Sequence, residues 1–208
     1  MTKSRRWFTR YATVCIGAAG ALIASLLTTP SAQSSTAHNF DWFPDTGAHS
    51  YCLGSTFVSN GWSPWAHDAM ANLEAQTIVD ATFYSNCADP TIDARWVLFQ
   101  RGELYGEWEC EDNQSTIVNG QWVCKSAYIK LNPSMILSAH TPGNQATKTS
   151  CHELGHGVGL AHYDFTFDPE YPGATACLRR GEWATSWGAG WNQYAPHHVS
   201  GHIDPWFN

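Results

Sequence analysis

Basic side chains are scarce in this sequence of 208 residues, which has 11 lysines and arginines against 18 aspartates and glutamates. Four of the basic residues stand close to the N-terminus, at Lys3, Arg5, Arg6 and Arg10. The rest of the chain has seven basic and eighteen acidic residues, a formal charge of −11. Such a charge argues against binding to nucleic acid or to an anionic membrane, because both carry negative charge themselves.

Long apolar runs and methionine are also sparse. The only long apolar stretch is residues 12–27, the sequence has no internal repeat, and the only low-complexity tract is residues 31–37. We therefore expect neither a repeat protein nor a stable membrane anchor. The three methionines are Met1, Met70 and Met135, all in the first two thirds of the chain.

Residues 1–37 have the features of a secretory signal peptide. A basic start is followed by the apolar stretch and then by small residues. Residues 4–10 read SRRWFTR and look like a twin-arginine export signal; the alternative is an ordinary signal with two arginines. We expect a secreted, extracellular protein whose residues 38–208 form a single domain, since about 170 residues suffice for one core.

Six cysteines remain after this segment, an even number that predicts three disulfides in an exported chain. They are Cys52, Cys87, Cys110, Cys124, Cys151 and Cys177. Cys110 and Cys124 flank the turn dipeptide Asn119 and Gly120, so a bridge across a hairpin is the first candidate pair.

Residues 152–162 read HExxHxxGxxH. On a helix, His152 and His156 lie on the same face and reach one ion, with Glu153 beside them. Gly159 favours the end of the helix, because glycine adopts a left-handed conformation without strain, and His162 then returns to the same ion. Chance gives the full string in fewer than roughly one in ten thousand sequences of this composition.

Three neutral imidazoles around zinc leave a fourth position for water, and Glu153 is placed to act as a general base in amide hydrolysis. The structural alternative is an amphipathic core helix with histidines at polar positions. Leu154, Val158 and Leu160 do predict a helix packed on a core, and both interpretations hold together.

At these residues the chain resembles the metzincin clan of zinc endopeptidases, and in its third-histidine spacing and size it resembles the matrixin-type catalytic domain. The resemblance implies one catalytic zinc held by His152, His156 and His162, Glu153 as base, and peptide or protein substrates. It also implies an α+β fold: a twisted, mostly parallel sheet, an active-site helix, a short C-terminal helix, and a cleft between a sheet edge and the zinc helix.

The methionine that metzincins carry in a turn beneath the zinc is missing here, since no methionine follows the motif. Residues 176–179 stand where that turn is expected, with Leu178 as the apolar substitute; Trp183 and Trp187 are the rival candidates. A Cys151–Cys177 bridge, the second candidate pair, would attach the catalytic helix to this segment.

The coarse secondary structure follows from patterning. We expect helices over residues 63–81, 145–158 and 196–207, strands over 93–99 and 126–131, and a hairpin of 116–118 with 121–123.

Three further clusters have competing interpretations. The acidic cluster Glu103, Glu107, Glu109, Glu111 and Asp112 is a calcium candidate, but its spacing fits no calcium loop and a solvated acidic face is preferred. Trp183, Trp187 and Trp191 are interpreted as core residues, as the wall of a substrate pocket, or as a sugar-stacking surface. His197, His198 and His202 are interpreted as exposed or capping residues, not as a second metal site.

Two functions follow. The first is a secreted, monomeric zinc endopeptidase, which the intact motif with Glu153 favours. The second is a non-catalytic, zinc-stabilised extracellular protein that binds peptide or glycan, which the missing methionine and the ten tryptophans after the signal segment favour.

Overall fold

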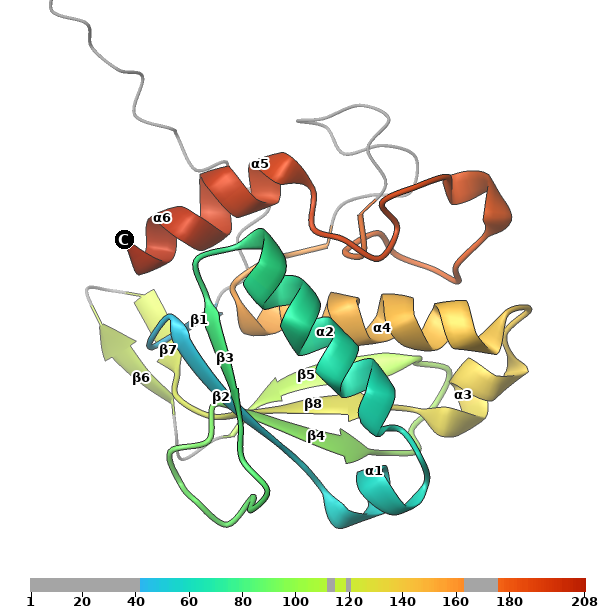
Figure 1. The fold of residues 1–208 in the computed structure, drawn as a ribbon, viewed down its shortest axis with the longest axis horizontal. Helices are drawn as coiled ribbons and strands as arrows, with labels where there is room; N and C mark the ends of the chain where they lie inside the picture. Colours follow the sequence, from blue (N-terminus) through green and yellow to red (C-terminus); the bar gives the residue numbers. More distant parts are fainter. Residues whose placement is uncertain (1–41, 112–114, 119–120, 163–175) are drawn as a thin grey trace, which may run out of the picture. The chain divides into compact units, whose positions relative to one another are not determined.

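A five-stranded sheet organises the part of the chain that the structure describes (Figure 1). This computed structural model describes residues 42–111, 115–118, 121–162 and 176–208, all within one unit, Ala32–Asn208. The predicted signal segment and Asp112 lie outside the described residues. The strands of the sheet are β2 (Ala48–Leu53), β3 (Asp80–Phe83), β4 (Ala94–Leu98), β5 (Gly106–Cys110) and β8 (Ala127–Leu131).

The order of the sheet is β3-β2-β4-β8-β5. The first three pairs are parallel, and β5 pairs with β8 in the antiparallel direction. β5 is therefore an edge strand, and no described strand pairs with its other side. A smaller sheet, in the order β1-β7-β6, consists of β1 (Trp42–Pro44), β6 (Ser115–Val118) and β7 (Gln121–Cys124).

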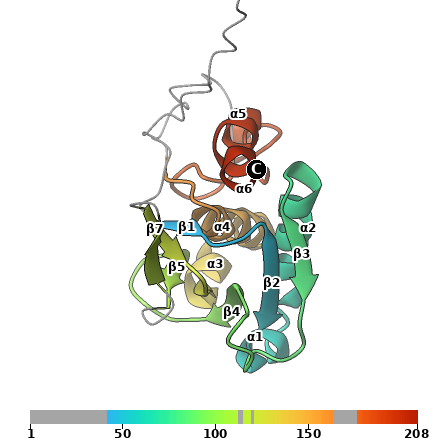
Figure 2. The ribbon, with the colours of Figure 1, turned by 90° about the vertical axis from the view of Figure 1, so that its left-hand side faces the viewer.

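Two long helices, α2 (Ser63–Gln76) and α4 (Pro142–Gly157), pack against each other; α2 also contacts β3, and α4 contacts β5 and β8. The shorter helices are α1 (Ser55–Ser59), α3 (Pro133–Ser138), η2 (Thr185–Trp187), α5 (Pro196–His198), η3 (Val199–Ile203) and α6 (Asp204–Phe207). Figures 1 and 2 show α5 and α6 on the side of α4 away from β4 and β8. The predicted α+β class with a mostly parallel sheet is confirmed.

The core lies between the sheet and these helices. α2 buries Ala66, Ala69, Met70 and Leu73, the spacing of one helix face, and β4 and β8 bury Trp96, Ile129 and Leu131. Among the described residues, no helix combines the length and the hydrophobicity needed to cross a membrane.

The predicted helix over 63–81 extends too far, because α2 ends at Gln76. Thr77 turns the backbone to an extended conformation, its hydroxyl donates to the carbonyl of Leu73, and it accepts the N–H of Val79. The β-branched run that starts at Thr77 favours extended chain over helix, and β3 follows at Asp80.

The C-terminal histidines were expected to be exposed or capping residues, and for two of the three the expected exposure is wrong. His198 is fully buried and His202 nearly so. They are four residues apart in a continuous helical stretch, α5 to α6, so both side chains lie on one face of it. The helix itself was expected over 196–207, and its bounds are confirmed.

Candidate metal centre

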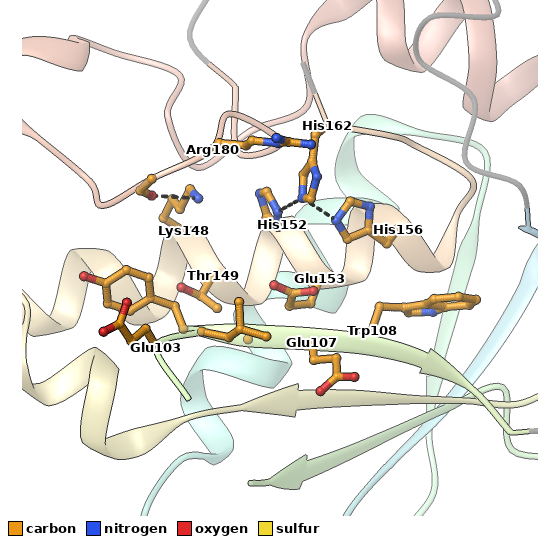
Figure 3. A pocket seen from close by; sticks show the side chains of 14 residues that line it. Glu103, Glu107, Trp108, Lys148, Thr149, His152, Glu153, His156, His162 and Arg180 are labelled. Carbon is orange, nitrogen blue, oxygen red and sulfur yellow. Dashed lines mark hydrogen bonds between the residues drawn. The ribbon is translucent and has the colours of Figure 1, made fainter. Parts of the chain in front are cut away.

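Helix α4 carries His152, Glu153 and His156, and it ends where the sequence requires. Gly159 has φ of +88°, the N–H of Gly159 donates to the carbonyl of His156, and the N–H of Leu160 donates to the carbonyl of Gly155. This pair of bonds is a glycine-based helix termination that satisfies the last carbonyls and reverses the chain. The reversal brings His162 back over the helix face that carries the other two histidines (Figure 3).

The three imidazoles converge on one point. His162 Nε2 lies 2.8 Å from His152 Nε2 and 3.0 Å from His156 Nε2. Within the described ranges, these three residues are the one group of histidine, cysteine and carboxylate side chains whose geometry could hold a metal ion. The acidic residues 103–111 form no such group.

Main-chain carbonyls fix which ring nitrogens face that point. His152 Nδ1 lies 2.7 Å from the carbonyl of Cys177, and His156 Nδ1 lies 2.7 Å from the carbonyl of Leu160. A carbonyl only accepts, so each Nδ1 carries the proton and each Nε2 is left with a lone pair. If His162 Nε2 carried a hydrogen, it could donate it to only one of the two facing atoms, His152 Nε2 and His156 Nε2. A cation between the rings, in contrast, would accept the lone pairs of all three nitrogens.

The donor set fits zinc. Around a tetrahedral zinc with Zn–N bonds of ~2.0–2.1 Å, two ligand nitrogens lie about 3.3 Å apart, a few tenths of an ångström more than the spacings to His162 Nε2. Burial, the largest cause, lowers the pKa of His156 to about 4 and that of His162 to about 3, and it holds the pKa of His152 well below its usual value. All three rings are therefore neutral at neutral pH, the form that ligates metal.

Glu153 is buried beside the histidines and against the edge strand. A Cβ on Gly106 of β5 would lie 2.6 Å from Glu153 Cγ, so only glycine leaves room for this carboxylate. Burial raises the pKa of Glu153 to about 8, while the Lys148 charge and a hydrogen bond from the main-chain N–H of Trp108 oppose that rise. A cation at the histidines would also favour the carboxylate form.

A cleft of about 480 Å³ opens over this group. Its walls are α4, the edge strand β5 with the loop before it, and the segment at Arg180 and Gly181 (Figure 3). Within the described residues, sequence reasoning missed Trp108, Lys148 and Arg180 as lining residues. β5 was not predicted as a strand, because its glutamates were interpreted as part of a solvated acidic face. Lys148 and Arg180 were not predicted, because a single lysine or arginine forms no sequence pattern.

Residues 176–179 lie directly against α4. Leu178 is fully buried, and its Cδ2 atom is 2.7 Å from where a Cβ on Gly155 would lie. Gly155 stands between the two helical histidines, and the preceding carbonyl, that of Cys177, orients His152. Leu178 thus packs beneath the helix turn that carries the site, and its replacement of the missing methionine stays a prediction.

The six cysteines form three disulfides, Cys52–Cys87, Cys110–Cys124 and Cys151–Cys177. Both candidate pairs are therefore present. Cys110–Cys124 joins the edge strand β5 to β7, and Cys151–Cys177 attaches α4 to the segment beneath it.

The tryptophans beyond the third histidine do not line the cleft. Trp187 is buried, with the Arg179 guanidinium over its ring at 4.5 Å, and the rings of Trp183 and Trp191 lie 5.5 Å apart. The acidic side chains of β5 and its end are paired with cations: Glu107 with Arg101, Glu109 with Lys130, and Glu111 with Arg95.

Comparison with known proteins adds no assignment: no model of a protein family matches the chain, and no curated protein or solved structure matches it either.

Proposed function

We propose that this protein is an exported, zinc-dependent endopeptidase. The observation that carries the proposal is the meeting of three Nε2 atoms at the floor of a cleft, with one buried carboxylate beside them. The resemblance to metzincins at residues 152–162 supports the same conclusion. The three disulfides favour an exported protein, because disulfides persist in oxidising compartments.

His152, His156 and His162 would hold the ion. Bound zinc supplies a Lewis acid for the carbonyl oxygen and lowers the pKa of a water molecule to about 7. Glu153 accepts a proton from the attacking water and delivers it to the leaving nitrogen, so that the water adds across the amide bond with no covalent intermediate. Burial suits Glu153 to this exchange, since it raises the affinity of the carboxylate for a proton.

The edge strand gives the substrate a place to lie. No described strand pairs with β5 on the side away from β8, and β5 forms one wall of the cleft. An extended peptide can pair with such an edge as an additional strand, which places its carbonyl groups over α4. This geometry favours an endopeptidase that acts on unfolded or extended segments.

The test is digestion of an unfolded protein and of a peptide library by the purified, zinc-loaded protein. We expect cleavage that a chelator abolishes. Glu153→Gln should retain zinc and lower turnover by ~10²-fold or more, as expected for a positioned general base. Glu74→Gln is the matched control, because Glu74 is exposed on α2 and does not line the cleft.

His156→Ala should lose the metal together with the activity, which separates ligand from base. Cleavage by Glu153→Gln at nearly the normal rate would contradict the proposed mechanism. Stoichiometric zinc with no hydrolysis of any substrate would favour the alternative, a zinc-stabilised binding protein.

A further inference from the structure

A buried lysine lies one helical turn before the first metal ligand. Lys148 is 4% exposed and stands four residues before His152 on α4, so both side chains lie on the same face, ~5 to 6 Å apart along the axis. Its side chain lines the cleft. Lysine is among the residues least often buried without a partner of opposite charge, so its presence here needs an explanation.

Within the described ranges, Lys148 forms no ion pair, although the charge of buried Glu153 favours its ammonium form. Its Nζ donates one hydrogen bond, to the carbonyl of Gly181 at 3.1 Å, and lies 5.8 Å from the centroid of the Trp187 ring. An ammonium group has three hydrogens to donate. Burial lowers the pKa of Lys148 to about 8, so the group is still mostly charged at neutral pH.

A second cation lines the same part of the cleft. Arg180 is exposed and precedes the residue whose carbonyl Lys148 contacts. Figure 3 shows Lys148 and Arg180 on the side of the histidines, whereas Glu103 and Glu107 lie along β5 on the opposite side. The two cations thus lie next to the three histidines, as does the Glu153 carboxylate, whereas the other two carboxylates of the cleft lie on the opposite wall.

Hydrogen bonds fix the wall that carries Arg180. The main-chain N–H of Trp183 donates to Gln145 Oε1 on α4 at 2.7 Å. Glu182 accepts from the main-chain N–H of His140 at 2.6 Å and from the Tyr105 hydroxyl at 3.0 Å, so both of its oxygens are engaged. The backbone of this wall is therefore set before any substrate binds, which lowers the entropic cost of binding.

We propose that Lys148 and Arg180 bind a carboxylate of the substrate, either an acidic side chain or a free C-terminus, within one or two residues of the bond that is cleaved. The distance supports this placement, because one helical turn of ~5.4 Å corresponds to between one and two residues of extended chain at ~3.3 Å each. The position relative to the cleaved bond rests on the proposed function, whereas the binding of the carboxylate is testable without catalysis.

The experiment measures affinity by calorimetry with the zinc-loaded Glu153→Gln protein, so that the peptides are not consumed. The probes are acetylated octapeptides in which one glutamate is moved along an otherwise neutral sequence, each matched with a glutamine peptide. A second arm compares a free C-terminus with an amide and thereby separates the two sources of carboxylate. We expect one or two positions at which the anionic peptide binds about 10-fold to 100-fold more tightly.

Substitutions in the same background assign the preference to these residues. Lys148→Met, of similar length, should abolish most of the preference, Lys148→Arg should retain it, and Arg180→Gln should reduce it. Arg179→Gln is the matched control, because the neighbouring Arg179 packs over Trp187 and does not line the cleft. A thermal melt of each variant shows that it has folded.

Equal affinity for every charged and neutral pair, or no measurable binding of either, would overturn the proposal. A preference that persists in both Lys148→Met and Arg180→Gln would overturn it as well. If Lys148→Met weakens glutamate and glutamine peptides by the same factor, the lysine supports the site in general and does not select a carboxylate. A preference found with a protein that cleaves nothing would support this inference while contradicting the proposed function.

Discussion

At the scale of single residues, the site depends on buried groups whose protonation is controlled by burial. The three histidines are neutral because charging them in the interior is costly, and Lys148 keeps its charge at a cost in stability. Each of these ionisable side chains loses hydration when it is buried, which costs stability. Residues of this kind concentrate at functional sites, where chemistry and not stability has set the choice of side chain.

The effect of burial on protonation can be measured at a histidine outside the site. His49 is buried below the end of α4, and burial lowers its pKa to about 4. His49 therefore becomes protonated near pH 6.5 in the unfolded chain, but only near pH 4 in the folded chain. The stability that neutral His49 provides is complete above pH 6.5 and is lost as the pH falls towards 4.

We expect the free energy of unfolding of the wild type, in the presence of a chelator, to fall by about 2 kcal/mol more than that of His49→Gln between pH 7 and pH 4.5. Denaturant titrations at the two pH values measure the difference. His140→Gln, at an exposed histidine, is the control and should follow the wild type. Equal pH dependence of His49→Gln and the wild type would show that folding does not lower the pKa of His49.

At the scale of secondary-structure elements, the close approach of α4 and β5 forms the site. The approach depends on Gly106, because a Cβ there would lie 2.7 Å both from Glu153 Oε1 and from Thr149 Cγ2. Either β5 would have to move outward, or Glu153 would have to leave its position. Both changes disturb the base, while the three histidines are on the other side of the carboxylate (Figure 3).

Gly106→Ala should therefore lower turnover by about 10-fold or more while zinc is retained, and it should lower stability by the ~1 to 3 kcal/mol typical of overpacking. Metal analysis, peptide hydrolysis and a thermal melt of one preparation measure all three effects. Gly143→Ala is the matched control, because a Cβ at Gly143 meets no atom within 4 Å. A variant with normal turnover would mean that the position of Glu153 is not the productive one.

Some of the helices and strands could be predicted from the sequence, and others could not. Helix α4, strands β4 and β8 and the hairpin of β6 with β7 were predicted because their signals are local: a motif, an alternation of side chains, or a turn dipeptide. Strands β1, β2, β3 and β5 were missed. β5 alternates two acidic side chains, Glu107 and Glu109, with Trp108, and it is held by an ion pair to Arg101 in the preceding loop and by its pairing with β8, about twenty residues further along the chain.

The candidate site divides in the same way. His152, Glu153, His156 and the helix end at Gly159 follow from spacing along one helix, so the sequence predicts them. The cations Lys148 and Arg180 could not be predicted, because they meet only after the chain has returned over α4. No spacing rule connects residues that are 32 positions apart on different elements.

At the scale of the whole molecule, disulfides hold together the segments that form the site. Cys151–Cys177 spans 26 residues, attaches α4 to the segment with Leu178, and lies next to His152. Cys110–Cys124 closes the edge strand onto the small sheet. These covalent links and the buried core between the sheet and α2 and α4 do not depend on a metal ion, so the metal-free protein should still fold.

We propose that one zinc ion at the three histidines makes the protein a peptide hydrolase. The most direct measurement is a titration of the metal-free protein with zinc, in which hydrolysis of an unfolded protein is followed at each addition. We expect turnover to rise in proportion to added zinc and to stop rising at one equivalent, and we expect Glu153→Gln to bind the same equivalent without turnover. Zinc bound at one equivalent with no hydrolysis, or hydrolysis that does not depend on zinc, would contradict this proposal.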